Sequence, residues 1–267
     1  MIVEWNNHMF SADQERYPLH PDAPYTPGFP DGDPLDDYME HMDREGIDRA
    51  VLVQPAPYQD DHRLILDCLA REPGRFKGVC LFLPEDEEAP ARMEELVQQQ
   101  PLFIATRFHP LGGKDLGLDS SLDPGVQAIW TKALELGLII ELHMDSTYAL
   151  PVANMLRQHP ESTVVIDHLA EAGFKSGTPV EFANLLDLAQ FDKVYMKLSG
   201  LSHFARDEPH YLSARPFTRR VIAEFGPDQL VWGSGTPGIV DAHMPEFSEQ
   251  DRMKVKGGNL VRLLGFE

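Results

Sequence analysis

Histidine side chains that follow short apolar runs are the most chemically informative feature of this sequence. Four of the eleven histidines stand directly after such runs, namely His8, His109, His143 and His168. One histidine of this kind is usually a hydrogen-bonded, half-buried residue. Four of them after four different runs indicate a shared site. Neutral imidazoles can polarise a carbonyl group, transfer a proton near pH 7 or bind a Zn²⁺-like ion.

Other polar residues end neighbouring runs and extend this set. Gln54, Lys197 and Asn6 are candidate substrate-binding residues, together with His109. Arg107 could bind a carboxylate through two parallel N–H groups, or it could form a structural ion pair. Lys197 could equally pair with a neighbouring carboxylate, and Asp167 could orient its neighbours through backbone contacts.

The apolar runs alternate with helical patterns along the whole chain. Strand-like runs occupy residues 2–8, 49–55, 76–83, 101–110, 138–145, 162–170, 193–201 and 229–237, and helical patterns occupy 33–46, 60–74, 87–100, 124–137, 149–160, 179–191, 213–226 and 248–266. The runs are apolar on both faces, as parallel strands covered by helices are. Eight such units predict a single-domain (β/α)8 TIM barrel over residues 1–267. A doubly wound open sheet is the alternative, disfavoured because no GxGxxG or P-loop follows any strand.

A TIM barrel brings the carboxyl ends of its strands together at one mouth, so the polar residues above would converge there. Two further segments are expected to shape that mouth. Residues 11–37 are rich in Pro, Asp and Gly, and we interpret them as a long ordered loop beside the site, although a disordered excursion is the competing interpretation. Residues 201–216 follow the seventh run.

Composition excludes several classes of protein. The net charge of −20 disfavours nucleic acid and anionic lipid as partners. No apolar run approaches 18 residues and no secretory signal is visible at the start, which predicts a cytoplasmic protein without membrane spans. Cys68 and Cys80 lie inside apolar patterns and are expected to be buried thiols. Acidic barrels often form dimers or larger homo-oligomers, but no sequence feature fixes the oligomeric state.

The order and spacing of several segments resemble the amidohydrolase-2 family of amidohydrolase-related TIM-barrel hydrolases. The segments are IVEWNNH, VLVQPAPYQDDHRLILDCL, GRFKGV, TRFHP, VVIDHLA, VYMKLSGL, QLVWGSGTP and GGNLVRLLGF. The resemblance is nearest to the branch that contains pyrone dicarboxylate lactonases and sugar lactonases. It implies hydrolysis of lactones, while other members of the wider family decarboxylate aromatic acids.

Two positions depart from the family pattern. Where the family has Asp-x-His-x-His, this chain has Glu4, Asn6 and His8, and Gly235 replaces the aspartate that follows the eighth strand. The resemblance implies that His8, His143 and His168 would be the ligands if a metal is bound. Because two ligands are lost, this degenerate site favours a metal-free centre over one Zn²⁺ or Mn²⁺ ion.

The resulting hypothesis is a hydrolase acting on a lactone or a related small carboxylic substrate. Arg107 would bind the substrate carboxylate, while His8, His143 and His168 would polarise the carbonyl. Asp145 or His168 would activate water in place of the missing aspartate. Two alternatives stay open, namely a decarboxylase or other lyase for a small acid, and a barrel that binds a ligand without turnover.

Overall fold

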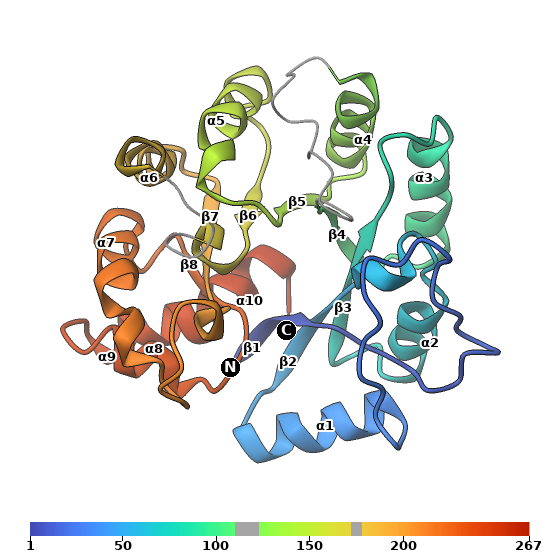
Figure 1. The fold of residues 1–267 in the computed structure, drawn as a ribbon, viewed down its shortest axis with the longest axis horizontal. Helices are drawn as coiled ribbons and strands as arrows, with labels where there is room; N and C mark the ends of the chain where they lie inside the picture. The colour runs from blue at the N-terminus through green and yellow to red at the C-terminus, as the bar shows by residue number, and fades with distance from the viewer. Residues whose placement is uncertain (110–122, 172–177, 267) are drawn as a thin grey trace.

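The computed structural model describes residues 1–109, 123–171 and 178–266 and forms a near-closed barrel of eight parallel strands (Figure 1). The strands pair in chain order, so the predicted TIM barrel is confirmed. They are β1 (Val3–Asn7), β2 (Arg49–Val53), β3 (Phe76–Leu81), β4 (Phe103–Phe108), β5 (Ile139–Leu142), β6 (Val164–Ile166), β7 (Val194–Leu198) and β8 (Leu230–Trp232).

The helices form a ring around the strands (Figure 1). They are α1 (Pro34–Glu45), α2 (Arg63–Arg71), α3 (Ala89–Gln99), α4 (Pro124–Glu135), α5 (Ala149–Gln158), α6 (Pro179–Leu186), α7 (Arg215–Phe225), α8 (Gly238–His243), α9 (Glu249–Met253) and α10 (Asn259–Leu264). The expected start and stop signals of α1 are confirmed. Asp33 accepts hydrogen bonds from the backbone N–H groups of Leu35 and Asp36, and Gly46 ends the helix in the left-handed region.

Two elements at the end of the chain differ from the predicted pattern. The helix α8 was not predicted, because its six residues are too few to show a helical period. The segment predicted as one helix or a helix pair divides into α9, a π-helical turn (Lys254–Gly258) and α10. Among the described residues, no helix is long and apolar enough to cross a membrane. Cys68 and Cys80 are buried free thiols, as expected.

The chain packs closely around Gly233, the residue that follows β8. A β-carbon at this position would lie 2.7 Å from the Ser199 side chain and 3.1 Å from the carbonyl oxygen of Trp5. Real β-carbons essentially never approach another atom to within 3.0 Å, so the 2.7 Å approach to Ser199 favours glycine at this point.

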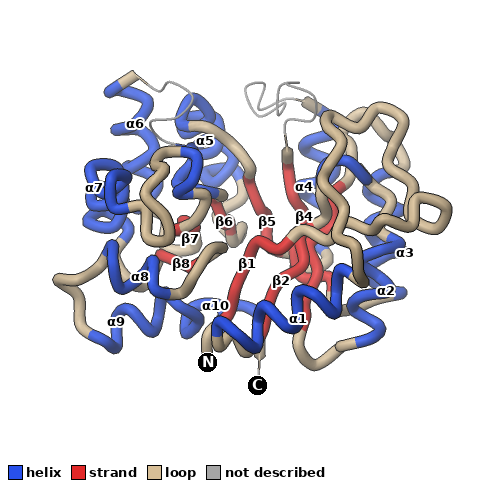
Figure 2. Tube along the Cα trace, turned by 60° about the horizontal axis from the view of Figure 1, so that its bottom comes forward, coloured by secondary structure: helices blue, strands red, loops and turns tan. Residues whose placement is uncertain are grey.

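Apolar side chains fill the inside of the barrel toward its amino end. They form one buried cluster of Val3, Trp5, Val51, Val53, Val79, Ala105, Ile139, Val165, Tyr195 and Val231, joined by Leu260, Leu264 and Phe266 from the end of the chain. Figure 2 shows α10 below the strands, near the chain termini. A second, larger cluster packs the outer faces of the strands against the helices.

The long connection between β1 and α1 has defined contacts with the residues that follow β2. The backbone N–H of Ser11 donates to the Tyr58 hydroxyl at 3.1 Å, and that of His20 donates to the carbonyl of Pro57 at 2.8 Å. Phe10 stacks on Tyr58 with ring centroids 6.1 Å apart. The first part of the connection therefore lies against the turn after β2.

Candidate active site

Four charged side chains occupy the barrel interior toward its carboxyl end. Arg107 lies in β4, Glu141 in β5 and Lys197 in β7, and Asp167 follows β6 directly. Each stands two residues after an inward-facing apolar residue, and side chains two apart on a strand share a face. Arg107 and Glu141 are also partners in the β4–β5 register. Strand geometry therefore aims all four at one another.

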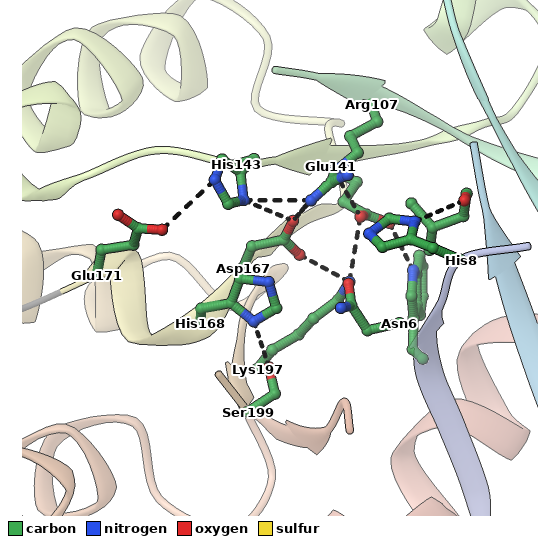
Figure 3. A network of polar contacts seen from close by, with 12 residues as sticks. Asn6, His8, Arg107, Glu141, His143, Asp167, His168, Glu171, Lys197 and Ser199 are labelled. Carbon is green, nitrogen blue, oxygen red and sulfur yellow. Dashed lines mark hydrogen bonds and ion pairs between the residues drawn. The ribbon is translucent and has the colours of Figure 1, made fainter. Parts of the chain in front are cut away.

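These four side chains form a closed network of ion pairs (Figure 3). The Lys197 Nζ lies 2.7 Å from Asp167 Oδ1 and 3.2 Å from Glu141 Oε1. The Arg107 Nη2 lies 2.6 Å from Asp167 Oδ2, and its Nε lies 3.2 Å from Glu141 Oε1. None of the four residues is more than 3% exposed. Two cations and two carboxylates are thus removed from water together, which is tolerated because each charge has partners of opposite sign.

Trp5 connects β1 to this network. Its indole N–H donates to Glu141 Oε2 at 2.5 Å, and its ring centroid lies 5.2 Å from the Lys197 Nζ. The ring therefore adds a cation–π contact to the ammonium group. Asn6, one residue further along, places its Oδ1 3.5 Å from the same Nζ.

The surroundings of the two carboxyl groups shift their pKa values in opposite directions. Burial alone would raise the pKa of Asp167, but Lys197 and Arg107 outweigh it and hold the pKa well below its usual value. For Glu141, burial and the adjacent Asp167 charge raise the pKa against the lowering effect of the two cations. Asp167 is therefore held as a carboxylate, and it binds protons too weakly to serve as a good base at neutral pH.

Three of the predicted histidines lie around this network, and a fourth stacks on one of them. His143 Nδ1 lies 3.2 Å from Arg107 Nη2, and His168 Nδ1 lies 2.9 Å from the Ser199 hydroxyl. His8 Nδ1 lies 2.8 Å from the Val53 carbonyl, which requires the proton on that nitrogen. His109 stacks on His143 with centroids 4.4 Å apart.

Burial keeps several of these imidazoles neutral. It lowers the pKa of His8 to about 3, with a further contribution from Arg107, and it lowers the pKa of His168 well below the ordinary value. Burial and Arg107 also lower the pKa of His109. Neutral imidazoles can donate one hydrogen bond to a carbonyl oxygen without adding charge to the site.

The backbone after β6 adopts a conformation that is rare for its residue types. His168, Leu169, Ala170 and Glu171 have φ values of 50°, 56°, 52° and 47°, a left-handed turn without glycine. This conformation costs roughly 1–2 kcal/mol for each residue, and strain of this kind clusters at functional sites. Gly200 accommodates the turn, because a β-carbon there would lie 2.7 Å from the Cβ of His168.

The turn brings one further carboxyl group to the histidines. Glu171 Oε1 lies 3.5 Å from His143 Nε2 and 3.6 Å from His203 Nδ1, and Glu171 is only 6% exposed. Glu171 was not identified from sequence, and Glu141 was hidden inside the apolar run of β5. His203 could be suspected because it follows the seventh strand.

Three predicted residues form hydrogen bonds with nearby protein groups. The Gln54 amide donates to the carbonyls of Gln59 and Asp61, both at 2.9 Å, and so holds the turn after β2. Asp145 caps a 3₁₀ turn (Ser146–Tyr148), where it accepts from the backbone N–H of Thr147 at 2.9 Å. In Arg107, the Nε–Nη2 edge of the guanidinium already contacts Asp167.

The residues present fit a divalent metal poorly. His143, Asp167 and His168 offer ligand atoms within 4.8 Å of one another, whereas His8 is not part of this group. Both Asp167 oxygens, however, already contact cations, and Arg107 also contacts His143. A dication would lie against two buried positive charges, with Asn6 and Gly235 in place of two family ligands. Gly235 has φ +88°, and a β-carbon there would lie 2.7 Å from Ile239.

Polar residues that converge at the carboxyl ends of the strands lie where TIM-barrel enzymes carry their active sites. The chain belongs to the Amidohydro_2 (amidohydrolase) family, whose model matches residues 7–266.

Three relatives illustrate the similarity. The 4-sulfomuconolactone hydrolase of Hydrogenophaga intermedia is 29% identical over 98% of this chain and 88% of its own length. The L-fucono-1,5-lactonase of Burkholderia ambifaria is 31% identical over 73% of this chain and 66% of its own. A candidate 2-pyrone-4,6-dicarboxylic acid hydrolase from Pseudomonas putida, known as a crystal structure, has a TM-score of 0.79 at 26% identity, covering 100% of this chain and 98% of its own.

Proposed function

We propose that this protein hydrolyses the ring ester of a small lactone. The observation that supports this most is that relatives aligned over most of the chain are lactone hydrolases or lactonases. The site is compatible with the reaction, because neutral imidazoles surround a position beside buried positive charge.

In this proposal the carbonyl of the lactone accepts a hydrogen bond from the neutral imidazole of His168. The Ser199 hydroxyl fixes the ring of His168 through Nδ1, which leaves Nε2 for the substrate. Negative charge that develops on the carbonyl oxygen is then stabilised by this donor and by the nearby cations. Arg107 is assigned a different role from binding a substrate carboxylate, because its Nε–Nη2 edge holds Asp167.

The test is a panel of lactones assayed for release of acid. The panel includes uncharged sugar 1,5- and 1,4-lactones and unsaturated lactones that bear a carboxylate or sulfonate. Mass spectrometry of the product separates the alternatives, since hydrolysis adds one water and decarboxylation releases CO₂. Ligand binding without any product would support the non-catalytic alternative.

His168→Ala should lower kcat/KM on the active lactone by about 100-fold, because a positioned hydrogen-bond donor is lost. His41→Ala is the control, since His41 lies on α1 away from the strand ends. A wild-type rate in His168→Ala would remove this residue from the mechanism.

Treatment with a chelator should leave the activity within about twofold of the untreated protein, because the donor set fits a dication poorly. A loss of rate that is restored by Zn²⁺ or Mn²⁺ would contradict this part of the proposal.

A further inference from the structure

The site holds few carboxylates that could take a proton from water. Both Asp167 oxygens contact buried cations, and Glu141 is held by the Trp5 indole and by the same cations. Asp145 caps the turn that follows β5. With Gly235 after β8, the position that carries an aspartate in the family pattern has no side chain. Glu171 lies at the edge of the ion-pair network, where its Oε1 faces the imidazoles of His143 and His203.

The two imidazoles beside Glu171 are more exposed than the ion-pair network. The side chains of His143 and His203 are 14% and 37% exposed, whereas those of Asp167 and Glu141 are fully buried. The Glu171 carboxyl lies between these two imidazoles, at 3.5 and 3.6 Å from their nitrogens. Glu171 is therefore the carboxyl group that lies next to partly exposed imidazoles.

The hydrogen bond from Arg107 determines how His143 faces Glu171. His143 Nδ1 lies 3.2 Å from Arg107 Nη2, which can only donate, and 3.5 Å from Asp167 Oδ2, which can only accept. We assign Nδ1 as the acceptor of the shorter contact, the one with Arg107. In the neutral ring the proton then lies on Nε2, the nitrogen that faces Glu171 Oε1. His143 therefore has no free lone pair for a water proton, and it orients the Glu171 carboxylate instead.

The left-handed turn gives a separate reason to assign a function to Glu171. Four successive residues without glycine adopt positive φ, at a cost of roughly 1–2 kcal/mol each. The turn places His168 against Gly200 and Ser199 while it returns Glu171 to the side of His143. A conformation of this cost persists where the geometry that it produces is needed.

We propose that Glu171 is the general base of the lactone hydrolysis, an inference that rests on the proposed function. The Glu171 carboxylate removes one proton from water while the water oxygen bonds to the carbonyl carbon of the lactone. The tetrahedral intermediate then breaks its ring C–O bond, and the proton held by Glu171 passes to the leaving alkoxide. The products are one hydroxyl and one carboxyl group on a single chain, and the carboxyl group releases its proton to solvent.

The experiment compares Glu171→Gln and Glu171→Ala with the wild type on the lactone that the wild type hydrolyses fastest. Both variants should lose about 100- to 1,000-fold in kcat with little change in KM, because the base acts in the chemical step. Formate should restore part of the rate of Glu171→Ala, on the order of tenfold, and should restore little in Glu171→Gln, whose amide fills the space. Sodium chloride at equal ionic strength controls for salt. The matched control is Glu161→Ala, a surface carboxylate whose side chain is 60% exposed.

A structural role for Glu171 predicts other results. Loss of rate without rescue by formate, together with a lowered unfolding midpoint in Glu171→Gln, would overturn the proposal. A wild-type kcat in both Glu171 variants would overturn it while lactone hydrolysis stands. Loss of kcat in Asp145→Asn alone would assign the base to Asp145. If the wild type opens no lactone of the panel, the proposed function fails first, and the role of Glu171 fails with it.

Discussion

The two ends of the barrel interior contain different kinds of side chain, apolar at the amino end and charged at the carboxyl end. Toward the amino end, Val3, Val51 and Val231 pack with Leu260 and Phe266 from the end of the chain. Toward the carboxyl end, the same strands present two cations and two carboxylates that contact one another. Hydrophobic burial stabilises the first end without requiring precise partners. The second end depends on exact pairing, because each buried charge is costly when its partner is absent.

The charged end should be the more sensitive of the two to a single substitution. Lys197→Met removes one cation and leaves Asp167 and Glu141 with a net negative charge in the interior. The expected loss is about 3–5 kcal/mol of unfolding free energy, measured by urea titration. Glu141→Gln in the same chain should recover part of this loss, since it restores the balance of charge. An equal loss in the single and double variants would show that the network is not coupled through charge.

The apolar end should respond through stability without a change in activity. Leu260→Ala removes a fully buried side chain and should cost about 3 kcal/mol of unfolding free energy. The rate per folded molecule should stay within about twofold of the wild type, because Leu260 packs in the apolar cluster at the other end of the barrel interior. A tenfold fall in kcat with the fold intact would contradict the expectation that the apolar end affects stability alone.

Glu4 lies on the face of β1 that meets α1, outside the barrel interior. Its titration changes the unfolding free energy with pH and would obscure the comparison between the two ends of the interior. Burial raises the pKa of Glu4 from 4.5 to about 7, and the carboxyl group contacts the Tyr38 hydroxyl at 2.5 Å. Because the pKa is higher in the folded state, the stabilisation is complete below about pH 4.5 and is lost as the pH rises through 7. Glu4→Gln has no such dependence. Its stability relative to the wild type should therefore increase by about 2.5 kcal/mol from pH 5 to pH 8. A constant difference in urea titrations across this range would exclude an elevated pKa.

Much of the fold could be predicted from the sequence because it rests on local patterns. Apolar runs of four to eight residues and capped helical segments fix the number and order of the β/α units. The helix α8 could not be predicted, because six residues show too little of a helical period. The inward direction of Arg107 and Lys197 follows from the period of two in a strand, once the barrel is assumed.

The site could be predicted only in part, since contacts across the barrel decide the roles of its residues. Glu141 lies between apolar residues of β5, and nothing in the sequence distinguishes it from a solvated carboxylate. The position of the Glu171 side chain depends on a left-handed turn that contains no glycine, so the sequence gives no signal for this turn. Gln54 and Asp145 follow strands, and their side chains form hydrogen bonds with backbone groups of the adjacent loops. The sequence pattern does not show these hydrogen bonds.

The balanced charges inside the barrel also bear on how this protein could change over evolution. Replacing one charged residue of the Arg107–Glu141–Asp167–Lys197 network leaves a charge of opposite sign unpaired in the interior. Substitutions that preserve the fold would therefore have to change two of these positions together. Residues that carry no charge and lie outside the network are not subject to that constraint. Single substitutions at uncharged positions around the network would therefore be tolerated more easily than single substitutions within it.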